Sequence, residues 1–141
     1  MKNLPVLLFL WLLLGWGQAA HSAGQQYEIN HIAFNSTFLA SEIAAAYKIT
    51  RAENMAVINV SVQPEGVIGE GVPAQVSGQV VNILNQVKPL AFTEVREEKA
   101  IYYIATLRFD DGDILTFKLD VLIDGEDKPR QVEWQQKFWK Q

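Results

Sequence analysis

Two short acidic segments contain the residues best suited to binding a metal ion. Residues 110–113 read Asp-Asp-Gly-Asp and residues 124–127 read Asp-Gly-Glu-Asp. Calcium prefers such oxygen ligands, but an EF-hand loop alternates its acidic residues before a glycine in the sixth place, and Gly112 stands third. A site shared by both segments would need them at one end of the fold. The strand between them predicts opposite ends, so we expect two solvated hairpin turns.

Residues for other chemistries are scarce. The chain has two histidines, His21 and His31, and no cysteine. A zinc site needs three or four ligands, and a Ser-His-acid triad would have to use His31. We therefore predict no catalytic residue, no metal site and no cofactor. The alternative is an enzyme of unfamiliar type in which two carboxylates converge in a cleft; its candidates are Glu42, Glu94 and Asp120.

Aromatic and aliphatic residues are better candidates for recognition. Tyr102 and Ile104 alternate with inward-facing strand residues, and on an open sheet face they would form a small apolar patch with Leu122. Tyr47 and Trp139 complete the candidate interaction surface. Packing inside the fold is the more ordinary role for such side chains. The edge strands of a sheet are a further place where a partner strand could bind.

The elements that must position these residues are mostly β-strands. Apolar and polar residues alternate with a period of two over much of the chain, which is typical of half-buried strands. Seven strands separated by turn residues are expected, at 26–35, 54–63, 74–84, 90–97, 100–109, 114–123 and 130–139. Gly78 indicates a bulge or a close contact within the third. This pattern predicts a mainly all-β fold, an immunoglobulin-like sandwich of two antiparallel sheets.

Residues 35–49 break the strand pattern and predict one short helix between the first two strands. Three apolar residues recur there at helical spacing: Leu39, Ile43 and Tyr47. Thr37 or Ser41 could cap its start. A helix of about two turns is not stable alone. We expect it to cover an open end of the sandwich; the alternative is that it borders a binding groove with Tyr102.

The N-terminus has the features of a secretory signal peptide. Lys2 precedes an apolar block over 4–17, and small residues follow it. The block is shorter than the roughly 20 residues that a membrane-spanning helix needs. Cleavage could follow any of three small residues: Ala19, Ser22 or Ala23. The sequence thus predicts a signal peptide over 1–23 and a protein without a stable membrane span after its removal.

Residues 24–141 have the usual length of a single domain. The full chain has a formal net charge of −4, and removal of Lys2 would make it more negative. Nucleic-acid binding needs a cluster of basic residues, and this chain has none. Without cysteine, no disulfide can staple the fold in an oxidising compartment.

Two stretches resemble one family of small exported proteobacterial proteins. Residues 38–47 read FLASEIAAAY and residues 54–62 read NMAVINVSV, and both are similar to the family catalogued as domain of unknown function 4426. The similarity extends over nearly all of residues 24–141. This chain departs from the family pattern at Ala40-Ser41, where a Thr-Pro pair opens the family's helix. The resemblance implies a periplasmic, β-rich domain, and it implies no activity.

The sequence therefore predicts a periplasmic protein that binds and does not catalyse. Its partner is expected to be another envelope protein, and its oligomeric state stays open. A carrier of a small ligand or of a weakly bound metal ion is the first alternative. The carboxylate enzyme is the second.

Overall fold

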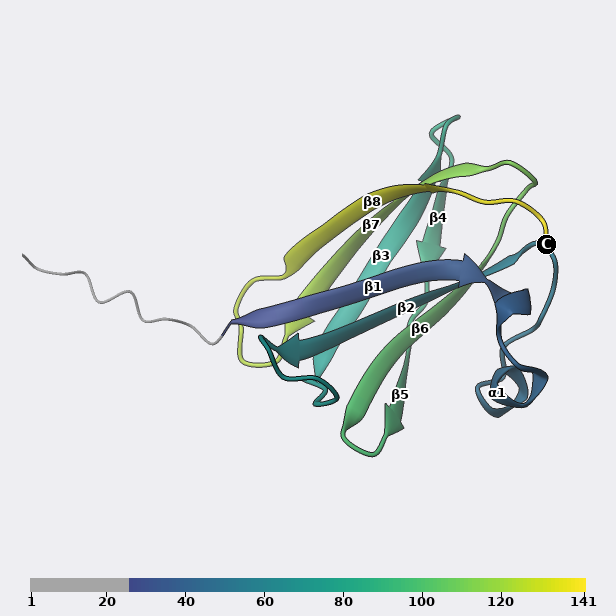
Figure 1. Ribbon diagram of the computed structural model, residues 1–141. Helices are drawn as coiled ribbons and strands as arrows, with labels where there is room; N and C mark the ends of the chain where they lie inside the picture. Colours follow the sequence, from purple (N-terminus) through teal and green to yellow (C-terminus); the bar gives the residue numbers. More distant parts are fainter. Residues whose placement is uncertain (1–25) are drawn as a thin grey trace, which may run out of the picture.

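The computed structural model describes residues 26–141, so the predicted signal peptide over 1–23 lies outside the described residues. Within the described part, eight strands form two antiparallel sheets that pack face to face (Figure 1). The first sheet has the order β1 (Tyr27–Asn35), β2 (Met55–Pro64), β6 (Ala100–Arg108) and β5 (Thr93–Glu97). The second has the order β4 (Val87–Leu90), β3 (Ala74–Asn82), β7 (Ile114–Ile123) and β8 (Arg130–Lys137). The predicted immunoglobulin-like sandwich is confirmed. No helix in the described part has the length and apolar character needed to cross a bilayer.

The eighth strand corrects the prediction for residues 85–97. A turn was expected over 85–89 and one strand over 90–97, but β4 covers the end of the first range and β5 most of the second. The chain leaves one sheet at Leu90 and enters the other at Thr93. Leu90 is buried in the core, so it anchors β4 to the second sheet before the crossing.

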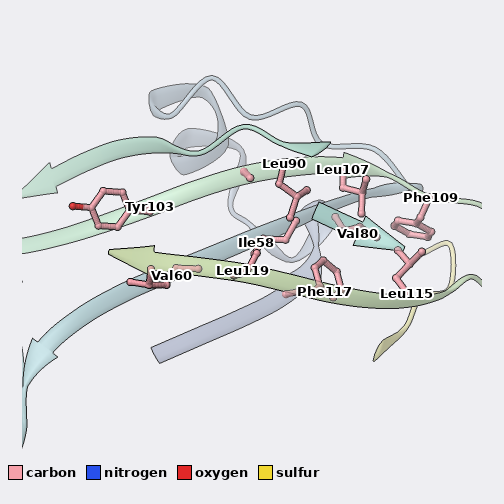
Figure 2. Close-up of a cluster of buried hydrophobic side chains, with 14 of the residues drawn as sticks. Ile58, Val60, Val80, Leu90, Tyr103, Leu107, Phe109, Leu115, Phe117 and Leu119 are labelled. Atoms are coloured by element: carbon pink, nitrogen blue, oxygen red, sulfur yellow. The ribbon is translucent and has the colours of Figure 1, made fainter. Parts of the chain in front are cut away.

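The core lies between the sheets and is built from inward-facing strand residues (Figure 2). Phe117, at its centre, is fully buried. The Phe117 ring stacks on that of Trp134, with ring centroids 4.5 Å apart and an interplanar angle of 8°. Burying each large apolar side chain contributes about 1.5–3 kcal/mol. The alternating apolar residues in the sequence are therefore the ones that face the core.

Gly78 marks a close approach between β3 and β7. A Cβ atom at this position would clash with the carbonyl oxygen of Lys118 and with Leu119. Only a glycine lets the two backbones approach this closely. The predicted close contact is confirmed.

The helical segment lies between the first two strands, as predicted, but its helix is shorter than residues 35–49. It consists of a 3₁₀ turn, η1 (Ser36–Phe38), and the helix α1 (Ser41–Ala46). The expected caps are wrong: the Asn35 side chain accepts from the N–H of Thr37 to cap η1, and no side chain caps α1.

The helix covers the outer face of the first sheet and does not close an end of the sandwich. Ala44 and Ile49 are buried against Val57 of β2. Val57 points away from the core because its neighbours Ala56 and Ile58 point into it. The outward apolar residues of the sheet therefore determine where the helix packs.

Candidate functional site

A hollow lies on the outer face of the first sheet, between α1 and the strands β2, β6 and β5. Its volume is about 330 Å³, and apolar side chains form most of its wall. The sheet contributes Val57, Tyr102 and Ile104. The connection between β1 and β2 contributes Ile43 of α1 and the flanking residues Leu39, Tyr47 and Ile49. The hollow exists because α1 is only six residues long and leaves the rest of this face uncovered.

One residue that lines the hollow, Asn59, has a buried polar atom without a protein partner. Asn59 follows Val57 by two residues on β2, so it faces outward as well, and it pairs across the strands with Ile32 and Ile104. Its Oδ1 is buried, and no donor in the described part of the chain lies within hydrogen-bonding distance. Glu97, at the end of β5, adds an exposed carboxylate to the wall.

The structure brings together three residues of the predicted interaction surface. Tyr47, Tyr102 and Ile104 all line the hollow. The arrangement matches the alternative prediction, in which the helix borders a groove with Tyr102. Leu122 does not join them, because β7 belongs to the second sheet and β6 to the first.

Trp139 is also separate from the hollow, since it packs over the 110–113 turn. Its ring lies next to Gly112, and the Nζ of Lys137 lies 4.3 Å from the ring centroid. In the same turn, Asp111 accepts from the backbone N–H of Lys140, and Asp113 accepts from that of Asp110. These carboxylates stabilise the C-terminal segment and the turn.

The tip of the β3–β4 hairpin is a second surface, which sequence reasoning missed. Ile83 and Leu84 follow β3 and are 71% and 73% exposed, and the tip protrudes at the top of Figure 1. The Asn82 Oδ1 accepts hydrogen bonds from the backbone N–H groups of Leu84 and Gln86, at 3.0 and 2.9 Å. The turn is thus held in place while it presents two aliphatic side chains to solvent.

The signal for this tip was present in the sequence. The predicted strand over 74–84 included Ile83 and Leu84 because they are apolar. Asn82 and Asn85 flank them, and asparagine favours turns and tolerates positive φ angles. Asn85 has a φ of 60°. The two asparagines could have placed the start of the turn at residue 83, two residues earlier than predicted.

The proposed catalytic carboxylates lie on three separate elements: Glu42 on α1, Glu94 on β5 and Asp120 on β7. A hydrogen bond from Arg96, and then one from Tyr103, holds the pKa of Glu94 below its ordinary value. His31 stacks on Trp134, with centroids 4.2 Å apart. Within residues 26–141, no three His, Asp or Glu side chains gather as metal ligands would.

Residues 26–141 form an immunoglobulin-like sandwich with one helix on the outer face of a sheet. The family model described as domain of unknown function, DUF4426, matches residues 21–141, and the chain belongs to this family. The resemblance seen in the sequence is confirmed. No curated protein matches the chain.

Solved structures show the same fold. A crystal structure of a DUF4426 family protein from Pseudomonas aeruginosa PAO1 is 28% identical, with a TM-score of 0.70, and the match covers 84% of this chain and 97% of that one. A copper-bound variant of FetP from uropathogenic Escherichia coli strain F11 is 13% identical, with a TM-score of 0.57 and coverage of 84% and 93%. FetP as isolated, expressed recombinantly in the periplasm of E. coli, is 14% identical, with a TM-score of 0.56 and coverage of 84% and 91%. At these identities, FetP shares the fold alone.

Proposed function

We propose that this chain is a non-catalytic binding protein of the periplasm, which contacts another envelope protein through the tip of its β3–β4 hairpin. The observation that carries the proposal is the exposure of Ile83 and Leu84 on a turn that Asn82 holds in place. Exposed apolar groups on a rigid scaffold are typical of binding loops. Val87, the first residue of β4, extends the apolar surface.

A protein partner suits this tip better than a lipid surface. Apolar elements that bind membranes usually combine their apolar face with basic residues that attract anionic lipids. Residues 82–87 contain no basic residue, and the chain as a whole is acidic. The tip therefore lacks the charge that would hold it on an anionic membrane.

Two observations support the compartment and the absence of catalysis. The predicted signal peptide over 1–23 supports export. FetP, which shares the fold, was expressed recombinantly in the periplasm of E. coli. Of the three candidate carboxylates, Glu94 has a lowered pKa, whereas a general acid at neutral pH needs a raised one. Cell fractionation and the N-terminal mass of the purified protein test export, and a cytoplasmic protein that retains Met1 would contradict it.

Photocrosslinking in living cells tests the binding surface. A photoreactive amino acid at position 83 should give an adduct with one envelope protein, and Leu84→Asp should abolish that adduct. The exposed Ser77, on the outer face of the same strand, is the matched control position and should give none. Leu84→Asp should leave the melting temperature unchanged, because the side chain is exposed. Equal adducts at positions 83 and 77, or an adduct that survives Leu84→Asp, would contradict the proposal.

A further inference from the structure

We propose that Asp124 is a site of spontaneous modification, at which its peptide bond to Gly125 isomerises to an isoaspartyl bond through a succinimide. The site lies in the turn between β7 and β8. The register of β3 and β7 places this turn at the opposite end of β3 from the hairpin tip, so it is independent of the binding surface proposed there. The chain has two Asp-Gly pairs, at 111–112 and 124–125, and the fold gives them opposite surroundings.

The reaction joins an aspartate carboxyl group to the peptide nitrogen of the next residue. That nitrogen attacks Cγ of the protonated carboxyl, so an N–C bond forms, a C–OH bond breaks, and water leaves with the amide proton. Water then opens the ring at either carbonyl carbon. One opening restores aspartate, and the other leaves the main chain running through Cβ and Cγ, with the mass unchanged. A following glycine favours the attack because it has no Cβ atom to hinder it.

Both reacting groups are free at Asp124 and Gly125. Both residues are exposed, and a Cβ atom on Gly125 would meet nothing within 4 Å. In the described part of the chain, the Asp124 carboxylate and the Gly125 N–H have no hydrogen-bonding or ionic partner. Other groups hold the turn. The Asp124 N–H donates to the Pro73 carbonyl at 2.9 Å, and the Glu126 N–H donates to the Ile123 carbonyl at the same distance. The carboxyl and the nitrogen can therefore meet without first breaking a hydrogen bond.

The same two groups are engaged at Asp111 and Gly112. The Gly112 N–H donates to the Phe138 carbonyl at 2.8 Å, so the attacking nitrogen already has a partner. The Asp111 Oδ1 accepts from the Lys140 N–H at 2.9 Å. The Trp139 ring would lie 3.3 Å from a Cβ atom on Gly112 and covers this side of the turn. Two hydrogen bonds must break before the ring can form here, which should slow the reaction at least about tenfold relative to the other pair.

The modification would alter contacts beyond the turn. An isoaspartyl residue adds one carbon to the main chain ahead of Glu126, whose carboxylate accepts from Arg130 Nε at 2.9 Å and from Nη2 at 2.8 Å. The Arg130 guanidinium also lies over the Tyr27 ring, with Cζ 5.6 Å from the centroid. A longer turn would displace Glu126 and loosen this connection between the edge strands β8 and β1.

Ageing of the folded protein followed by peptide mapping tests the inference. The purified protein is kept for weeks in mildly acidic buffer, and electron-transfer fragmentation distinguishes isoaspartate from aspartate in each peptide. We expect isoaspartate to accumulate at Asp124 at least about tenfold faster than at Asp111. In urea the two pairs lose their different surroundings, so both should react at similar rates.

Two matched variants assign the signal to one residue. Asp124→Glu lengthens the side chain by one CH₂ group, which disfavours ring closure, and it should remove nearly all the isoaspartate that protein L-isoaspartyl methyltransferase detects. Asp111→Glu makes the same change at the protected pair and should leave that signal almost unchanged. A melting curve checks that both variants fold.

Three results would overturn the inference. The first is an equal rate at the two pairs in the folded protein. The second is no isoaspartate at Asp124 in the folded protein although it forms in urea, and the third is a signal that survives Asp124→Glu. None of these measurements involves the hairpin tip, so failure of the modification site and failure of the protein-binding surface give different results.

Discussion

The Tyr103 hydroxyl donates a hydrogen bond to Oε1 of Glu94 at 3.1 Å, and it accepts one from the backbone N–H of Ala74 at 2.8 Å. Tyr103 and Glu94 belong to the first sheet, and Ala74 begins β3 of the second. One buried phenol thus joins the two sheets through polar contacts at the edge of an otherwise apolar core.

Tyr103→Phe should lower the free energy of unfolding by about 1–3 kcal/mol, because it leaves the Ala74 N–H without its acceptor. Urea denaturation followed by tryptophan fluorescence measures this. Glu94→Gln is the milder control, since the hydroxyl keeps its contact with Ala74. A Tyr103→Phe protein as stable as the parent would show that water replaces the phenol without loss.

The same phenol predicts a loss of stability in alkali. Burial raises the pKa of Tyr103 above its ordinary 10.0, and the Glu94 carboxylate adds to the shift. The folded state therefore favours the neutral phenol. This contribution is complete below the unfolded pKa of about 10 and is lost as pH rises through the folded value. Melting temperatures measured from about pH 9 upward should fall less steeply in Tyr103→Phe, and parallel curves would argue against the assignment.

In acid, Glu126 should have the opposite effect. The hydrogen bond from Arg130 holds the pKa of Glu126 below its ordinary 4.5, with Arg130 Nη2 2.8 Å from Oε2. A lowered pKa contributes stability above the unfolded value, and that stability is lost as pH falls through the folded one. Glu126→Gln should therefore reduce the decline in melting temperature below about pH 5. An unchanged fall in melting temperature at low pH would show that this half-buried pair contributes nothing to stability, as many surface pairs do.

Gly78→Ala should destabilise the fold by about 1–3 kcal/mol, because the new methyl group meets the Lys118 carbonyl and the backbone must move. Guanidinium denaturation measures the change. Ser77→Ala, one residue earlier and exposed, should have almost no effect. A stabilised Gly78→Ala would mean that the loss of unfolded-chain entropy outweighs the clash.

The sequence predicted most of the strands well. It predicted the crossing between the sheets and the position of α1 less well. Alternation along 114–123 identified the inward face because burial of residues such as Phe117 dominates the energetics there. The sequence did not predict that the chain crosses from one sheet to the other between Leu90 and Thr93. The pattern of apolar residues in a strand is the same whichever sheet the strand joins. The position of α1 could not be predicted for a related reason. Its apolar residues at helical spacing indicate that the helix packs against something, but only the fold shows that Val57 belongs to the surface it packs on.

The candidate site could be predicted in part. Tyr47, Tyr102 and Ile104 line one hollow, and helical spacing for Tyr47 and strand alternation for Tyr102 and Ile104 had selected each of them separately. Asn59 could not be found, because a polar residue at an outward strand position normally meets water. Sequence periodicity does not show which outward residues of β2 the helix packs against.

Strand β4 has a consequence for how the hairpin can act. It forms one border of the second sheet, has four residues, and includes Pro89, which carries no amide hydrogen. So short a border, with a missing donor, is poorly suited to adding a foreign strand or to polymerising with copies of itself. The binding that we propose for the hairpin therefore relies on the exposed side chains of Ile83 and Leu84, and not on strand pairing along β4.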